Sequence, residues 1–233
     1  MNFQLLLLTL FLCALVSSVY AQQTIFNVPT TDVLDKGKVY AELDASFKVN
    51  DSATQSKFSS FVPRVVVGAG GNVEFGLNLI GNIQPGADAT TLVPTVKFRL
   101  YSSKDKSVAV IAGSNVFIPV RNRSYNIGTW SYAAVSKTIS KTRITAGAYM
   151  ATKKVFASNT RVGGQFGVEQ TVNSKFSVAA DWISGKHSAG YLTPGMIYKP
   201  VPKLTTYFAY SIGNVNVTHG NHFFLFEVGW NFN

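Results

Sequence analysis

The stretch Phe224-Leu225-Phe226-Glu227-Val228-Gly229-Trp230-Asn231-Phe232 decides the fold of this chain. Large apolar side chains occupy every second position, and the residues between them are mostly small or polar. Because successive side chains of a β-strand point to opposite faces, this spacing gathers the apolar residues on one face. The stretch therefore predicts a strand with one apolar face and one mixed face.

The same spacing of two recurs along most of the chain after Gly37. Val73, Phe75 and Leu77, for example, alternate with polar or small neighbours. No segment keeps the spacing of three and four residues that a helix with one apolar face requires. Reading all such runs gives about twelve expected strands, each near the length that crosses a bilayer at a tilt. They cover residues 37–48, 58–69, 72–82, 90–101, 107–118, 126–138, 142–152, 163–172, 174–184, 188–199, 203–213 and 220–232.

The connections between these runs alternate in length. Short turns are expected at 70–71, 103–106, 140–141, 173 and 200–202, and longer loops at 49–57, 83–89, 119–125, 153–162 and 214–219, with 185–187 the one short exception among the latter. Short turns at one rim and long loops at the other are typical of strands that run up and down around a closed barrel. Residues 37–233 are therefore predicted to form an all-β, transmembrane, antiparallel up-and-down β-barrel of about twelve strands.

The N-terminal region is expected to differ from the barrel pattern. Residues 1–21 hold no charged side chain and contain the apolar run Leu5–Val16 followed by small residues, which predicts a cleaved signal peptide. The only cysteine of the chain, Cys13, lies within this segment. Residues 22–36 are expected to form either a periplasmic N-terminal segment or a small plug in the lumen, and the sequence leaves both open. No later run is long enough for a helical span, so a membrane-inserted form has to satisfy its backbone by closing into a barrel.

With this signal, these alternating strands and turns, and the aromatic ending 224–232, the chain resembles the outer-membrane β-barrels of Gram-negative bacteria. The resemblance covers residues 37–233. It implies export to the outer membrane and insertion by the barrel-assembly machinery, which in that family reads an aromatic-rich last strand. The residues that would carry this assembly signal are Phe224, Phe226, Val228, Trp230 and Phe232. One departure is Asn233, because the family usually ends on the aromatic residue itself.

If the apolar positions face lipid, the charged positions between them point into the lumen, where water tolerates them. The side chains expected to line the lumen are Glu42, Asp44, Arg64, Glu74, Lys97, Arg99, Arg143, Glu169, Asp181 and Glu227. Closure makes the last strand a neighbour of the first, so an acidic cluster around Arg64 is expected. Such a cluster is either an ion-pair ladder that braces the wall or a charged constriction that selects solutes by sign. The facing of residues 107–118 and 126–138 stays open, because both of their faces are nearly equally apolar.

The predicted strand number favours a small, monomeric porin or channel for passive passage of ions or small polar solutes. About twelve strands leave a lumen between those of filled eight-stranded and open sixteen-stranded barrels. The alternatives are a closed structural or surface-binding barrel without transport, and an outer-membrane hydrolase. His187 beside Ser188 resembles the pairing of outer-membrane phospholipases, in which the two residues are instead separated by one residue and lie on strands. The sequence lacks a nucleophile elbow, a zinc-protease helix motif and a phosphate-binding loop, so we predict no enzymatic activity.

The net charge of +10 does not indicate nucleic-acid binding, because the lysines and arginines are scattered singly. The expected partners are outer-membrane lipid and lipopolysaccharide, the latter near Lys153, Lys154 and Arg161 unless these form a plain solvated loop. No cofactor and no metal are predicted. The weak metal candidates are His187, His219 and His222, which fall in or beside neighbouring outer loops.

Overall fold

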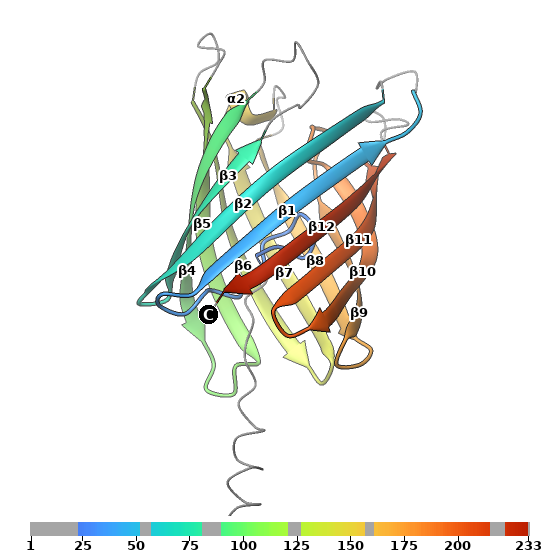
Figure 1. The fold of residues 1–233 in the computed structure, drawn as a ribbon. Coiled ribbons are helices and arrows are strands. Elements are labelled where there is room, and N and C mark those ends of the chain that lie inside the picture. The colour runs from blue at the N-terminus through green and yellow to red at the C-terminus, as the bar shows by residue number, and fades with distance from the viewer. Residues whose placement is uncertain are drawn as a thin grey trace, which may run out of the picture.

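The computed structural model describes residues 23–51, 57–80, 90–120, 127–156, 161–214 and 222–232, and these form a closed antiparallel barrel (Figure 1). The strands pair in chain order, and β12 returns to pair with β1. They are β1 (Val39–Lys48), β2 (Phe58–Gly70), β3 (Val73–Ile80), β4 (Thr91–Ser102), β5 (Val108–Pro119), β6 (Gly128–Ile139), β7 (Thr142–Ala151), β8 (Val162–Thr171), β9 (Phe176–Ile183), β10 (Tyr191–Val201), β11 (Leu204–Gly213) and β12 (His222–Phe232).

This architecture confirms the predicted barrel class and strand order. The largest boundary difference is in β10, which begins at Tyr191 where the sequence suggests residue 188. A one-turn helix, α2 (Lys153–Phe156), lies in the loop between β7 and β8. Among the residues described, no helix is long and apolar enough to cross a membrane. The expected signal peptide, residues 1–21, lies outside the described residues, as does Gln22.

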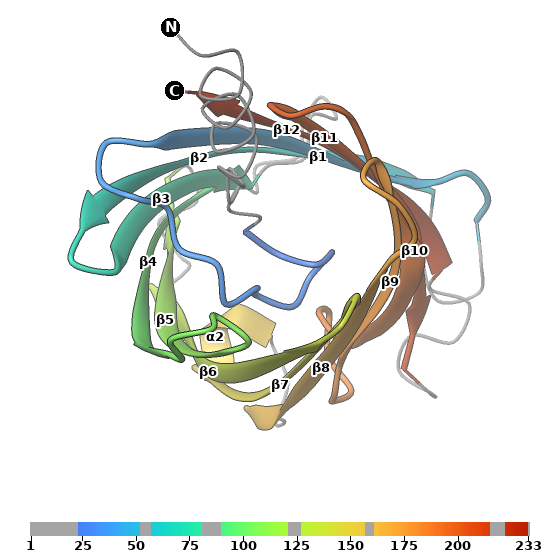
Figure 2. The same ribbon diagram turned by 90° about the horizontal axis from the view of Figure 1, so that it is seen from below.

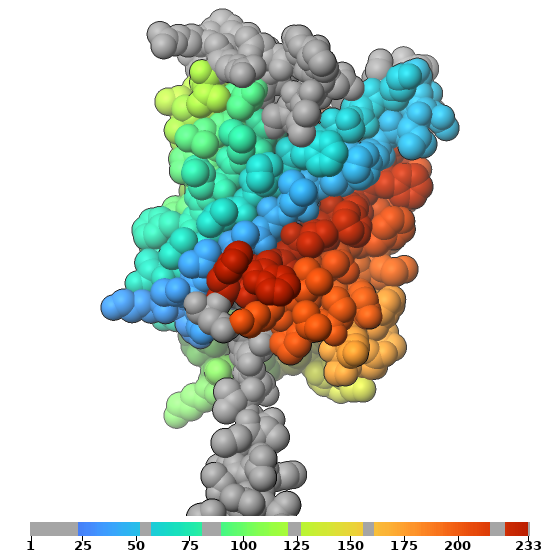
Figure 3. Space-filling model, viewed as in Figure 1, coloured from blue at the N-terminus to red at the C-terminus, as the bar shows by residue number. Residues whose placement is uncertain are grey.

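The outer face of the wall carries the apolar half of each alternating strand. Phe75, Phe208 and Phe226 are 55%, 49% and 41% exposed, although each is a large hydrophobic side chain. Figure 3 shows the tilted strands β1, β12 and β11 running side by side across one such face. Because closure leaves no free strand edge, every strand can satisfy its backbone within the wall. An apolar exterior around a polar interior is the arrangement that suits hydrocarbon outside and water inside.

The structure assigns the two strands whose facing the sequence leaves open. Direct cross-strand pairing sets Ile111 against Ala134 and Lys97 against Gly113, so these positions share the inner face. Ile111 is fully buried, and it packs together with Ala134 and Val33. The inner faces of β5 and β6 are therefore apolar because they contact another part of the chain inside the barrel.

That part is the lumen segment, which we define as residues 23–34. Seen along the barrel axis, the chain before β1 runs into the interior of the barrel (Figure 2). Ile25 and Val28 are fully buried, whereas Asp35 and Lys36 are exposed where the chain leaves the interior. The backbone N–H of Gly37 then donates to the carbonyl of Gly68 at 2.9 Å, beside the short β2–β3 turn. The segment thus lies within the barrel and leaves it at the rim of the short turns.

Candidate functional site in the barrel interior

The lumen segment begins with a tight turn whose amides converge on one wall carboxylate. The Ile25 N–H donates to the Val28 carbonyl at 2.9 Å, which closes the turn. The backbone N–H groups of Phe26, Asn27 and Val28 then all donate to Oδ2 of Asp181, at 3.0, 2.5 and 2.7 Å. Successive N–H groups that point into one hollow form an anion-binding nest. Asp181 on β9 is the anion here, so it anchors the segment.

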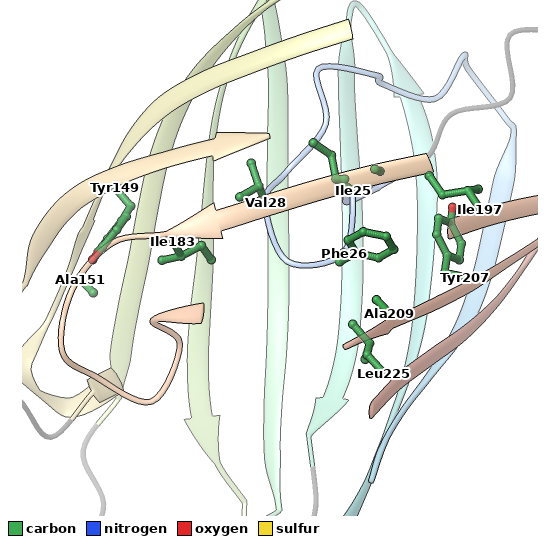
Figure 4. Packing of buried hydrophobic residues seen from close by; sticks show 11 residues of the cluster. Ile25, Phe26, Val28, Tyr149, Ala151, Ile183, Ile197, Tyr207, Ala209 and Leu225 are labelled. Atoms are coloured by element: carbon green, nitrogen blue, oxygen red, sulfur yellow. The ribbon is translucent and has the colours of Figure 1, made fainter. Parts of the chain in front are cut away.

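The same turn also packs its apolar side chains against one side of the wall. Figure 4 shows Ile25, Phe26 and Val28 directed toward residues of β9 to β12. Phe26 meets the ring of Tyr207 edge to face, with centroids 6.5 Å apart. The wall residues of this cluster on β9 to β12 are Ala179, Ile183, Ile197, Tyr207, Ala209 and Leu225, and the cluster continues to Tyr149 and Ala151 on β7. Apolar packing therefore fills the space between the segment and the β9–β12 side.

A buried ion pair on β3 and β4 holds the segment from a second direction. Lys97 Nζ lies 2.8 Å from Glu74 Oε1, and both side chains are less than 5% exposed. Glu74 Oε2 accepts the backbone N–H of Leu34 at 2.8 Å and the side-chain amide of Gln23 at 3.3 Å. Lys97 donates to the Gln23 side-chain oxygen at 3.2 Å and to the Thr30 carbonyl at 3.5 Å. The hydrogen bonds from the segment replace the water that these charges would otherwise need.

A third contact is made on β7 and β8. Arg143 donates to Glu169 through Nε at 2.5 Å and Nη2 at 2.9 Å, and its Nη1 reaches Asp32 at 2.7 Å. One residue earlier in the segment, the Thr31 hydroxyl lies 2.5 Å from that of Ser136 on β6. Wall charges on three sides of the interior are thus paired with the segment.

The seam at which β1 pairs with both β2 and β12 holds the acidic cluster expected from the sequence. Arg64 donates to Glu42 at 2.5 Å and to Asp44 at 3.1 Å, and Tyr40 donates to the other oxygen of Glu42. Glu227 lies directly across from Asp44 in the β1–β12 register. We call Glu42, Asp44 and Glu227, with Arg64, the seam cluster. Glu74 on neighbouring β3 binds Lys97 and the lumen segment instead of Arg64.

Arg99 lies apart from these groups. Its guanidinium donates to the Asn72 side-chain oxygen at 3.2 and 2.8 Å, in the short turn between β2 and β3. The bonded pair is exposed at the short-turn rim. Arg99 therefore does not join Lys97 and Arg143 in the interior.

The lumen segment leaves polar space beside it. A cavity of about 130 Å³ lies between the segment and the inner faces of β2 to β6, lined by Arg64, Asn78, Thr95, Lys97 and Asn115 among others. A second cavity of about 280 Å³ reaches the short β6–β7 turn and is lined by Asp32, Arg143, Glu169 and Lys199 among others. The segment thus packs its apolar turn against the β9–β12 side, and on the β2–β6 side a polar cavity lies beside its contacts with Glu74 and Lys97.

The two histidines that the structure describes, His187 and His222, make separate contacts. His187, in the loop between β9 and β10, is buried; its Nδ1 accepts the Ala189 N–H at 3.2 Å and its Nε2 lies 2.7 Å from the Tyr149 hydroxyl. Burial lowers the pKa of His187, which favours the neutral ring. His222 stacks on Tyr210 with centroids 6.0 Å apart, and His219 lies outside the described residues.

The remaining candidate residues lie on the outer surface. Phe224, Phe226, Trp230 and Phe232 point outward from β12 and are exposed, and Val228 on the same face is partly exposed. Lys153, Lys154 and Arg161 are exposed in or beside the loop between β7 and β8.

Comparisons with known proteins agree with this architecture. No protein-family model and no curated protein matches the sequence. An outer-membrane channel from Pseudomonas putida F1 is similar in structure, with a TM-score of 0.50 and 10% identity over 91% of this chain and all of that one. The KdgM porin, in complex with oligogalacturonate, has a TM-score of 0.52 and 8% identity over 84% and 98% of the two chains. Outer membrane phospholipase A from Escherichia coli has a TM-score of 0.50 and 10% identity over 84% and 90%. The fold is thus shared by channels and by an enzyme.

Proposed function

We propose that the protein is a channel of the Gram-negative outer membrane that passes ions or small polar solutes along one side of its own lumen segment. The observation that carries this proposal is the polar cavity beside the segment. Apolar packing closes the β9–β12 side of the segment's turn, whereas a cavity of about 130 Å³ lies between the start of the segment and the inner faces of β2 to β6. The path follows this second side.

The lining of that cavity supports a polar solute. Thr95, Asn78 and Asn115 offer hydroxyl and amide groups, and Arg64 and Lys97 add charge. Such groups replace part of the water shell of an ion or a polar solute as it passes a narrow point. A barrel with a purely structural role would instead fill this side with packed side chains.

The membrane placement follows from the apolar exterior and belongs to the same proposal. The long loops face outside the cell and the short turns face the periplasm, as in bacterial barrels generally. The assembly machinery recognises the outward aromatic residues of β12. Lys153, Lys154 and Arg161 contact the phosphates of lipopolysaccharide, whose charge is complementary to theirs. In the same proposal the barrel acts as a monomer.

Conductance of the purified protein in a planar lipid bilayer tests the channel. We expect discrete single-channel steps from the wild type, a severalfold smaller step when Thr95→Phe narrows the cavity, and a larger step when residues 23–34 are deleted. Thr206→Phe is the matched control, because it adds the same bulk to the outer face of β11 and leaves conductance unchanged. The channel is ruled out if the wild type gives no conductance steps and if liposomes that contain it stay impermeable to small sugars and ions. That result would instead establish a closed structural barrel.

The pinning of the lumen segment on three sides favours that structural barrel as the second candidate. Each of Asp181, Glu74 and Arg143 contacts the segment directly. Catalysis is a third candidate. The described contacts of the His187 ring are with the Tyr149 hydroxyl and the Ala189 amide. Incubating the detergent-solubilised protein with phospholipid decides this point, and we expect no release of fatty acid.

A further inference from the structure

The seam cluster concentrates buried negative charge where the barrel closes. Glu42 and Asp44 lie on β1 and Glu227 on β12, and one oxygen from each lies within 4.8 Å of the other two. Glu227 is 1% exposed and Glu42 is 5% exposed. Arg64 contacts two of these carboxylates, Glu42 and Asp44. Three carboxylates facing one guanidinium leave two negative charges uncompensated when all are ionised.

Two oxygens of the cluster also lack a hydrogen-bond donor. Asp44 Oδ1 and Glu227 Oε2 are buried and have no partner among the described residues. Tyr207 is the direct cross-strand neighbour of Glu227 on the inner face. Buried polar atoms are almost always paired, so a fully buried, unpaired Glu227 oxygen that faces two further carboxylates points to a cation at this position.

We infer that the seam cluster binds one Ca²⁺ ion. Ca²⁺ takes oxygen ligands at about 2.3–2.6 Å in a flexible geometry. Three carboxylate oxygens that lie within 4.8 Å of one another can all reach one such ion. Mg²⁺ demands near-ideal octahedral geometry and usually keeps several waters, which suits this buried cluster less well. The donors are all hard oxygens, which Ca²⁺ prefers over the nitrogen and sulfur ligands that suit zinc or copper.

The ion would link the first strand, β1, to the last strand, β12. It supplies the two positive charges that the cluster lacks, and it joins a ligand on β12 to two ligands on β1. This role concerns the stability of the barrel and does not depend on whether the lumen conducts.

Calcium binding to the full mature chain, refolded into synthetic detergent and freed of metal with a chelator, tests the inference. Refolding into detergent excludes lipopolysaccharide, which itself binds divalent cations. Isothermal titration with CaCl₂ should show one ion per chain, and Tb³⁺ should give luminescence excited through the neighbouring tyrosines. Ca²⁺ should raise the melting temperature more than the same concentration of Mg²⁺.

Glu227→Gln removes one ligand charge without changing its size, and it should weaken Ca²⁺ binding by at least about tenfold. Asp44→Asn should do the same and serves if the first variant does not refold. Asp35→Asn is the control, an exposed carboxylate at the short-turn rim that lies outside the cluster, and it should keep the wild-type affinity. The inference is overturned if the wild type binds neither Ca²⁺ nor Tb³⁺, or if both seam variants bind Ca²⁺ as tightly as the wild type does. It is also overturned if the control variant loses as much Ca²⁺ affinity as the seam variants. The inference is also overturned if lowering the pH raises the melting temperature of the barrel and Ca²⁺ does not change it, because protons rather than Ca²⁺ then neutralise the carboxylates.

Discussion

Replacing Asp181 with alanine is predicted to release the lumen segment. The Asp181 carboxylate is 1% exposed and accepts three backbone N–H groups at 3.0, 2.5 and 2.7 Å. A hydrogen bond to a charged group contributes about 1.5–3 kcal/mol, and a buried donor left unpaired costs about 1–3 kcal/mol. Bonds that share one acceptor do not add fully, so we expect a loss of about 4 kcal/mol. That loss raises the open fraction of the segment about a thousandfold.

Thiol accessibility measures this opening. Cys13, within the expected signal peptide, is the only cysteine, so Val33→Cys gives the mature chain a single thiol, at a position 6% exposed in the closed barrel. A soluble maleimide then reacts only when the segment opens, and its rate follows the open fraction. Asp181→Asn, which keeps one acceptor oxygen, should raise the rate about thirtyfold, for a loss of about 2 kcal/mol. A rate within about threefold of the parent for Asp181→Ala, well below one tenfold step of about 1.4 kcal/mol, would refute the anchor.

Thr145→Val is the control for the same experiment. Thr145 is fully buried on the inner face of β7, and its hydroxyl has no hydrogen-bond partner among the described residues. Valine has nearly the same shape, so the rate should not change. An increase equal to that of Asp181→Ala would show that any change to the interior opens the segment.

Three further predictions follow from single contacts. Lys97→Met leaves Glu74 buried without its cation, and it should lower the free energy of unfolding by about 3–5 kcal/mol in a urea titration, whereas an unchanged midpoint would contradict the pairing. Phe208→Arg places a charge on the lipid-facing side of β11 and should cost about 2–4 kcal/mol in vesicles; a loss that is equally large in short-chain detergent would argue against lipid contact. Burial lowers the pKa of His187, so its contribution to closing the β9–β10 loop is complete above the ordinary histidine pKa of about 6.5 and is lost as the pH falls below it. Hydrogen exchange of the Ala189 amide should therefore be faster, relative to a His187→Gln control, at pH 5 than at pH 7.5, and equal ratios would contradict the prediction.

The strands were predictable because one rule governs them. A wall residue faces either lipid or the interior, so apolar and polar residues alternate wherever the interior is polar, as in Phe224 to Phe232. The rule fails on β5 and β6, where Ile111 and Ala134 face inward and pack on Val33. The strands β5 and β6 are apolar on both faces because the lumen segment packs against their inner face. Together with the apolar residues Ile25 and Val28, this pattern on β5 and β6 would have favoured a plug in the lumen over a periplasmic segment.

The partners of the interior charges were less predictable than their facing. Cross-strand neighbours such as Glu42 and Arg64 follow from closure once the register is known. The contacts of Asp181 do not follow, because its donors are backbone amides more than 150 residues earlier in the chain. A backbone N–H carries no sequence signature, so only the fold of the turn at residues 25–28 reveals it. For Arg99, the alternation along the strand predicts which face the side chain lies on. It does not predict that the guanidinium bonds Asn72 at the short-turn rim.

The wall and the lumen segment depend on each other through desolvation. Glu74 and Lys97 are less than 5% exposed in a barrel in which the segment contacts both of them. Removing a single partner leaves a charge buried and unpaired, whereas removing the whole segment lets water reach every wall charge at once. Deletion of residues 23–34 should therefore destabilise the wall less than Lys97→Met does within the intact chain. If the deletion proves the more damaging change, the apolar packing of Ile25, Phe26 and Val28, rather than the polar contacts, dominates the coupling between segment and wall.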